Sequence, residues 1–166
     1  FDKRDFIEHQ RWPYCLITAT DKVFRQDYNV MMDKHLESGA DITVLYSRDQ
    51  RLMQDDSGFT SFFQMDGDQV VGMQATPPTS SNFVANLGVC LMDKNLLLEL
   101  VEDTCAEGRY DFDMDLLRDA AQKYKMVGVE HEGYVGGISS VKSYFDTNHD
   151  MLDKDVRYDL FNPDFP

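Results

Sequence analysis

Two short apolar runs on either side of an amphipathic segment constrain the fold of this chain most strongly. Residues 14–19 (YCLITA) and 41–47 (DITVLYS) have the length and β-branched content of buried strands. Between them lies a predicted helix that ends at Gly39. One face of this helix carries Tyr28, Met31, Met32, His35 and Leu36. A strand, a helix and a strand in this order form a βαβ unit, whose crossover makes the two strands parallel.

The rest of the chain continues to alternate between strand and helix patterns. Residues 60–65 and 69–73, separated by Asp66-Gly67-Asp68, predict a small β-hairpin. The polar residues 48–58 predict a loop. Further strands are predicted over residues 83–92 and 125–129, and further helices over 93–101, 113–123 and from about 138 onward. The predicted class is α/β, with a mainly parallel sheet and a small β-hairpin insertion.

Composition and charge exclude several classes of function. The net charge of −14, from 30 acidic and 16 basic side chains, would repel DNA or RNA. The apolar runs are too short to span a membrane, and no secretory signal is present. Cys15, Cys90 and Cys105 are odd in number and lack a paired spacing, which argues against disulfides and a structural zinc site. These features predict free thiols in a reducing compartment, and therefore a cytoplasmic location.

Asp21 is the first candidate for chemistry because it lies two residues beyond the first predicted strand. In open α/β sheets, ligands bind beyond the carboxyl ends of the strands. A carboxylate in this place is a suitable ligand for Mg²⁺, which neutralises phosphate charge in phosphoryl transfer. Asp21 could equally cap the next helix or satisfy a turn, and position alone favours that structural role.

The stretch around Asp21 resembles a region of the glucose-1-phosphate adenylyltransferases. In that family the region has the approximate sequence Y-V-L-I-L-S-G-D-H-I-Y-K-M-D-Y, followed by a helix that ends in H-x-x-x-G-A-D-x-T-V. Asp21 falls on the aspartate that binds Mg²⁺ in the family, and Asp27-Tyr28 falls on its D-Y. His35 and Gly39-Ala40-Asp41 match as well.

The resemblance continues in the same order along the chain. Residues 84–89 (VANLGV) resemble L-A-S-M-G-I, Tyr110-Asp111-Phe112 resembles H-D-F, Glu132-Gly133-Tyr134 resembles E-G-Y, and Asp159-Leu160-Phe161 resembles D-L-Y. The resemblance implies a partial Rossmann-like sheet of the nucleotide-diphospho-sugar transferase type. It also implies that residues 1–166 are the C-terminal half of a sugar-nucleotidyltransferase-like domain. The glycine-rich nucleotide loop would then lie upstream of this sequence and a β-helix domain downstream.

Several positions that carry the family's chemistry differ in this chain. The lysine of the family's E-K-P motif, which holds the sugar phosphate, aligns with Thr76. The serine that contacts the sugar aligns with Asn86, and the second metal-binding aspartate aligns with Gly137. Thr20 and Lys22 replace the Gly and His on either side of the metal aspartate. Thr76, Asn86 and Gly137 are therefore predicted to be degraded substrate-binding positions, and Mg²⁺ binding at Asp21 is expected to be weak or absent.

Such losses resemble the regulatory D subunit of bacterial glycogen biosynthesis. The resemblance implies a chain without catalytic residues of its own, which joins a catalytic glucose-1-phosphate adenylyltransferase subunit in a heterotetramer. Two alternatives stay open. One is an active nucleotidyltransferase in which Asp111 or Glu132 helps Asp21 to hold the metal. The other is a module that binds a sugar or a nucleotide without catalysis.

Other clusters of polar residues predict structure rather than chemistry. Asp111, Asp113 and Asp115 alternate as in a calcium loop, but the pattern lacks its glycine and its terminal glutamate. His35 on a helix face is predicted to be a core histidine. Ser139 or Ser140 is predicted to cap the last helix.

Overall fold

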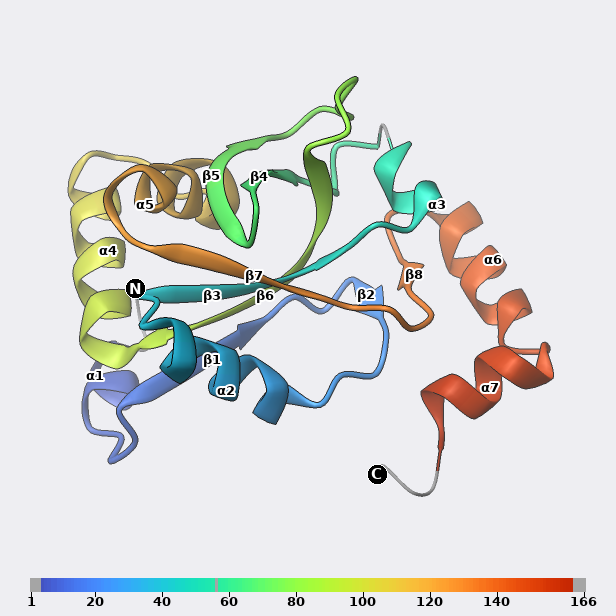
Figure 1. Ribbon diagram of the computed structural model, residues 1–166, viewed down its shortest axis with the longest axis horizontal. Coiled ribbons are helices and arrows are strands. Elements are labelled where there is room, and N and C mark those ends of the chain that lie inside the picture. Colours follow the sequence, from blue (N-terminus) through green and yellow to red (C-terminus); the bar gives the residue numbers. More distant parts are fainter. Residues whose placement is uncertain (1–3, 56, 163–166) are drawn as a thin grey trace.

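A six-stranded sheet forms the centre of the computed structural model, which describes residues 4–55 and 57–162 (Figure 1). The strands follow the order β1-β6-β3-β7-β5-β4 across the sheet. Their bounds are β1 (Tyr14–Thr18), β3 (Ile42–Ser47), β4 (Phe62–Asp66), β5 (Gln69–Gln74), β6 (Phe83–Asp93) and β7 (Met126–Glu130). A separate two-stranded ladder pairs β2 (Lys22–Val23) with β8 (Gly136–Gly137).

The predicted α/β class is confirmed, but the prediction of a mainly parallel sheet is wrong. Among the described strands, β3 and β7 form the one parallel pair, and every other pairing in the sheet is antiparallel. Strands β1 and β3 do run in the same direction, as the βαβ unit requires, because both are antiparallel to β6. Strands β1 and β3 are not neighbours in the sheet. Strand β6, which comes much later in the chain, lies between them and pairs with both. The local pattern of residues 14–47 holds no information on that insertion.

The predicted hairpin forms as strands β4 and β5, and it is part of the core. Its turn places Gly67 at φ 58°, a left-handed conformation that favours glycine. Strand β4 also pairs with β6, and β5 pairs with β7 at Gln69 and Val127, so that five strands form a closed circuit of pairings. Phe62 and Phe63 are both fully buried, and each belongs to a different core cluster. The hairpin therefore contributes a buried phenylalanine to the core on each face of the sheet.

Helices cover both faces of the sheet. On one face, α2 (Tyr28–Ser38) and α3 (Gln50–Met53) contribute Met31 and Leu52 to a cluster with Leu45 and Leu87. On the other, α4 (Lys94–Ala106), the π-helix η1 (Phe112–Leu117) and α5 (Arg118–Lys123) pack against the strands. The short helix α1 (Arg4–Glu8) contacts α4 through an ion pair from Arg4 to Glu102. Helix α3 corrects the prediction of an uninterrupted loop over residues 48–58.

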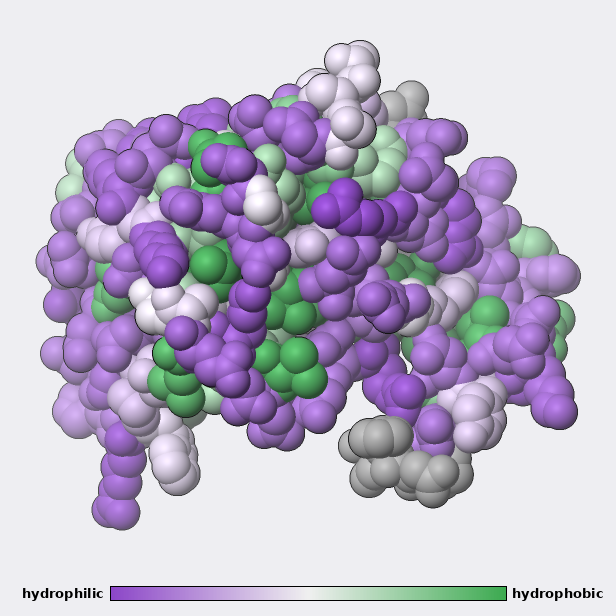
Figure 2. Space-filling model, viewed as in Figure 1, coloured by the Kyte–Doolittle hydropathy of each residue, from purple (hydrophilic) through white to green (hydrophobic). Residues whose placement is uncertain are grey.

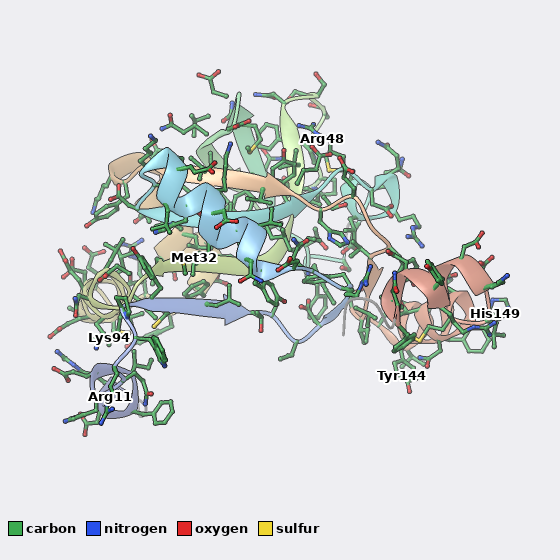
Figure 3. The ribbon with its side chains drawn as sticks, turned by 60° about the horizontal axis from the view of Figure 1, so that its bottom comes forward. Arg11, Met32, Arg48, Lys94, Tyr144 and His149 are labelled. Carbon is green, nitrogen blue, oxygen red and sulfur yellow. The ribbon has the colours of Figure 1, made fainter. Side chains whose placement is uncertain are left out.

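The last two helices, α6 (Val141–Asp150) and α7 (Lys154–Leu160), lie beyond β8 and away from the main sheet (Figure 1). Ser140 caps α6 in a capping box with Ser143, so of the two predicted caps, Ser139 and Ser140, the structure has Ser140. The predicted last helix ends at Asp150, and α7 follows it as a separate helix. Figure 3 shows Tyr144 and His149 on α6, at the end of the molecule opposite Arg11 and Lys94. Thr147 is the buried residue of this helix, so α6 joins the rest of the protein through a narrow contact.

The surface is mostly hydrophilic on the face drawn in Figure 2, in keeping with the high content of charged side chains. Within residues 4–55 and 57–162, no helix combines the length and the apolar character needed to cross a bilayer.

Candidate functional site

Asp21 lies in the short connection between the end of β1 and β2. The β2–β8 ladder pairs Lys22 with Gly137, and the Ile138 N–H donates to the Asp21 backbone oxygen at 2.7 Å. The chain therefore brings Asp21 and Gly137 side by side, although they lie far apart in the sequence. The assignment of Gly137 to the position of a second metal carboxylate stays a prediction.

Gly137 has room for a side chain. A Cβ built at this position would meet no heavy atom closer than Leu52 Cδ2 at 3.8 Å, an ordinary contact distance. Its neighbour Gly136 differs, because a Cβ there would lie 2.6 Å from Thr147 Cγ2. Packing therefore does not require glycine at residue 137.

A pocket of about 290 Å³ lies beside Asp21 and also contains Asn86. Besides these two residues, the lining includes Lys22, Phe59, Ser61 and Asp113. Two of the positions singled out in the sequence, Asp21 and Asn86, therefore share one cavity. Gly137 adjoins it through its pairing with Lys22.

The floor of this pocket is a buried polar network. Asn86 Nδ2 donates to Ser61 Oγ and to Asp113 Oδ2, both at 3.0 Å, while Ser61 Oγ donates to Asp113 Oδ2 at 2.7 Å. The amide oxygen of Asn86 accepts the Gly88 N–H at 2.7 Å. Burial raises the pKa of Asp113, although the hydrogen bonds from Ser61 and Asn86 and the charge of Lys22 act against it. Each polar atom of Asn86 thus has a protein partner in this network.

The raised pKa of Asp113 predicts a pH-dependent gain in stability for the Asp113→Asn variant. The folded carboxyl holds its proton more tightly than the unfolded one, so the wild type loses stability as pH rises above about 3.9, the ordinary value. An asparagine keeps the acceptor oxygen for Ser61 and Asn86 but has no charge to bury. Urea unfolding between pH 3.5 and 7 should show that the free energy of unfolding of the variant, relative to that of the wild type, increases as pH rises. The exposed control Asp66→Asn should show no such trend, and an equal offset of Asp113→Asn at every pH would contradict the expectation.

Thr76 lies apart from this pocket. It is exposed in the segment after β5, and its backbone oxygen accepts a hydrogen bond from Gln74 Nε2 at 2.6 Å. Neither the side chain of Thr76 nor that of the adjacent Ala75 carries a charge. This segment therefore offers no cation for a sugar phosphate.

Arg51, which lines a second pocket together with Gly137, is already engaged by other groups. Arg51 donates to Asp49 Oδ2 at 2.8 Å, to Asp150 Oδ2 at 3.1 Å and to the Val135 oxygen at 3.2 Å. Its guanidinium also lies 5.4 Å from the centre of the Tyr134 ring. The hydrogen bond to Asp49 raises the pKa of Arg51 above its usual range. The Arg51 guanidinium therefore cannot bind a sugar phosphate without breaking those contacts.

The residues around Asp21 do not fit a bound Mg²⁺. Lys22 Nζ lies 3.3 Å from Asp21 Oδ2 and forms an ion pair with it. Within the described parts of the chain, no three His, Cys, Asp or Glu side chains are grouped so that they could hold a metal ion. Mg²⁺ prefers an octahedral shell of oxygens, usually including one or two carboxylates. Here the carboxylate already has an ammonium partner.

Neither replacement carboxylate considered for an active metal site lines the pocket. Asp111 caps η1, because its Oδ1 accepts the Met114 N–H at 2.7 Å, and Glu132 is exposed after β7. The carboxylate that does line the pocket is Asp113. The sequence did not predict this role for Asp113, because Asp113 was considered only as part of a possible calcium loop with Asp111 and Asp115. Lys22 was noted as a departure, but the sequence carries no signal that its ammonium turns back onto Asp21.

Known proteins were compared with this chain by sequence. No family model matches the chain. It is 26% identical to the glucose-1-phosphate adenylyltransferase of Halalkalibacterium halodurans over 98% of this chain and 43% of that protein. It is 25% identical to the enzyme of the same name from Methylococcus capsulatus, over 100% of this chain and 42% of the relative. For the enzyme of Mycoplasma mobile the identity is 24%, over 96% and 42%.

These matches confirm a distant similarity to glucose-1-phosphate adenylyltransferases along the whole chain. The chain spans less than half the length of the curated relatives. All three share the same name, so the matches do not separate a catalytic from a regulatory subunit.

Proposed function

We propose that this chain belongs to a non-catalytic or weakly catalytic regulatory subunit of glucose-1-phosphate adenylyltransferase, acting in ADP-glucose and glycogen synthesis. The observation that carries the proposal is the pairing of Asp21 with Lys22, next to a glycine at residue 137. The catalytic reaction of the complex would join ATP and glucose 1-phosphate into ADP-glucose and pyrophosphate. In this proposal another subunit performs that reaction.

The charges of the pocket support a site that has lost its chemistry. Transfer of a nucleotidyl group requires cations to neutralise the phosphates as charge develops. Asp21 and Asp113 contribute carboxylates to the pocket, while Lys22 is paired with Asp21. Thr76 supplies no positive charge, and Arg51 is held by Asp49 and Asp150. A phosphate dianion would therefore meet acidic groups without a free cation to offset them.

The fold is compatible with this origin in one further respect. We place the chain within a Rossmann-like domain of the nucleotide-diphospho-sugar transferase type, of which the mixed sheet would be a part. Asp21 follows β1 at its carboxyl end, where ligands bind in such sheets. The partner would be a catalytic subunit in a heterotetramer.

An activity assay on the full-length protein alone tests the proposal. We expect the rate of ADP-glucose formation from ATP and glucose 1-phosphate with Mg²⁺ to be at least about a hundredfold below that of a catalytic subunit, since one lost electrostatic contact has effects of that size. Co-expression with the catalytic subunit should yield a mixed oligomer whose kinetics differ from those of the catalytic subunit alone. A rate comparable to that of the catalytic subunit would refute the proposal.

A binding module without catalysis is the second candidate, and the intact pocket beside Asp21 and Asn86 favours it. Calorimetry with ATP and with glucose 1-phosphate separates the two. Heat from either ligand in the absence of the partner would support a ligand-binding role. No heat from either ligand would support a role through interfaces.

A further inference from the structure

We infer that Lys22 is a built-in cation: its ammonium takes the place of a divalent metal beside Asp21, and the pocket admits no Mg²⁺ while Lys22 is present. The inference deepens the proposed function, on which it rests, because it names the residue that keeps the metal out.

The first support is the burial of the Lys22 side chain. It is only 6% exposed, whereas the side chain of Asp21 is 34% exposed. A lysine side chain with so little access to water is favoured by a nearby opposite charge, since an unpaired buried ion is strongly destabilising. The 3.3 Å contact between Lys22 Nζ and Asp21 Oδ2 supplies that charge. The pair is therefore part of the folded structure and differs from an incidental surface contact.

The second support is the effect of the Lys22 charge on further carboxylates. Its charge lowers the pKa of Asp55, where burial acts in the opposite direction and hydrogen bonds from Ser57 and Thr60 also lower it. Its charge also opposes the rise in the pKa of Asp113 that burial causes. Lys22 is thus ion-paired with Asp21, and its charge also acts favourably on the ionised carboxylates of Asp55 and Asp113. Without Lys22, these three carboxylates would lose that positive charge.

The third support is the way in which the backbone fixes Lys22. Strand β2 is anchored to β8 by the pairing of Lys22 with Gly137, and the Asp21 backbone oxygen accepts the Ile138 N–H. The ammonium reaches the carboxylate of the neighbouring residue from this fixed base. Moving it outward would leave Asp21 and Asp113 without their shared counterion. A divalent ion that approached Asp21 would meet an ammonium already at the carboxylate, and like charges repel at this range.

The test measures Mn²⁺ binding by electron paramagnetic resonance in the full-length protein, without substrates. The wild type and Lys22→Arg should leave Mn²⁺ free. Lys22→Gln and Lys22→Met should bind it at least about tenfold more tightly than the wild type, as the loss of one opposing charge predicts. Adding Asp21→Asn to Lys22→Gln should abolish the gain. Lys34→Gln removes the same charge from a half-buried lysine that is paired with Asp68, so it controls for net charge and should behave as the wild type.

Two results would overturn the inference. One is Mn²⁺ binding by the wild type that Asp21→Asn removes, a comparison that needs no variant of Lys22. The other is a folded Lys22→Gln or Lys22→Met variant, as judged by circular dichroism, that binds Mn²⁺ no better than the wild type. The outcomes also separate this inference from the proposed function. An inactive wild type that binds Mn²⁺ at Asp21 refutes the inference alone, and an active wild type that leaves Mn²⁺ free refutes the proposed function alone.

Discussion

Replacing Phe62 or Phe63 by alanine is expected to lower the free energy of unfolding by about 4 kcal/mol in each case. Both side chains are fully buried on strand β4, and they point to opposite faces of the sheet. Phe63 packs in the cluster with Val44 and Leu116, and Phe62 packs in the cluster with Met31 and Leu87. Each substitution removes a large apolar surface and leaves a cavity that neighbouring strands cannot close.

Urea unfolding measures this effect, with Phe59→Ala as the matched control. Phe59 belongs to the same segment but is 60% exposed, so its truncation should change stability by less than about 1 kcal/mol. A hairpin that was merely inserted on the surface would tolerate all three substitutions equally. Losses below about 1 kcal/mol for both Phe62→Ala and Phe63→Ala would show that β4 is not an integral strand.

The second large effect is expected at Gly88, where alanine should cost about 3 kcal/mol from backbone strain and overpacking together. Gly88 has φ +70°, and a Cβ there would lie 2.4 Å from the Cβ of Ala19. The two segments cannot separate easily, because the Gly88 oxygen accepts the Ala19 N–H at 2.7 Å. The contact fixes the chain at the end of β1, just before Asp21. Gly88→Ala should therefore also displace the pocket that Asp21 and Asn86 share.

Gly108 provides the matched control for Gly88. Its φ is +73°, but no atom lies within 4 Å of the position where its Cβ would be. Gly108→Ala should cost only about 1 kcal/mol, the part due to the left-handed backbone. Thermal unfolding of the two variants separates strain from overlap. Equal losses would mean that the contact with Ala19 relaxes at no cost.

The sequence predicted most elements of the fold, because local patterns determine them. The amphipathic helix ending at Gly39, the Asp-Gly hairpin and the cap at Ser140 all depend on residues within a few positions of one another. The direction and order of the strands depend on pairing between distant segments. Nothing in residues 14–47 indicates that β6 enters between β1 and β3, so the sheet was expected to be mainly parallel.

The candidate site shows the same division. The resemblance to a known family indicated Asp21, Asn86 and Gly137. The structure places Asp21 and Asn86 in one pocket, and it pairs Gly137 with Lys22, the neighbour of Asp21. It leaves Thr76 outside the pocket. Lys22, Ser61 and Asp113 form contacts that determine the electrostatics of the pocket, but each depends on where a side chain turns in space. Only the environment of these residues distinguishes them from ordinary surface residues.

The central position of β6 has a consequence for synthesis of the chain. Strands β1, β3 and β4 all pair with β6, whose residues follow them in the sequence. During translation these strands cannot pair with β6 until residue 93 has emerged from the ribosome. Pairings over such long separations also slow folding, because the entropy of closing the long loops is lost before the stabilising contacts form. The nascent chain therefore passes through a period with unpaired apolar strands, when chaperones would protect it against aggregation.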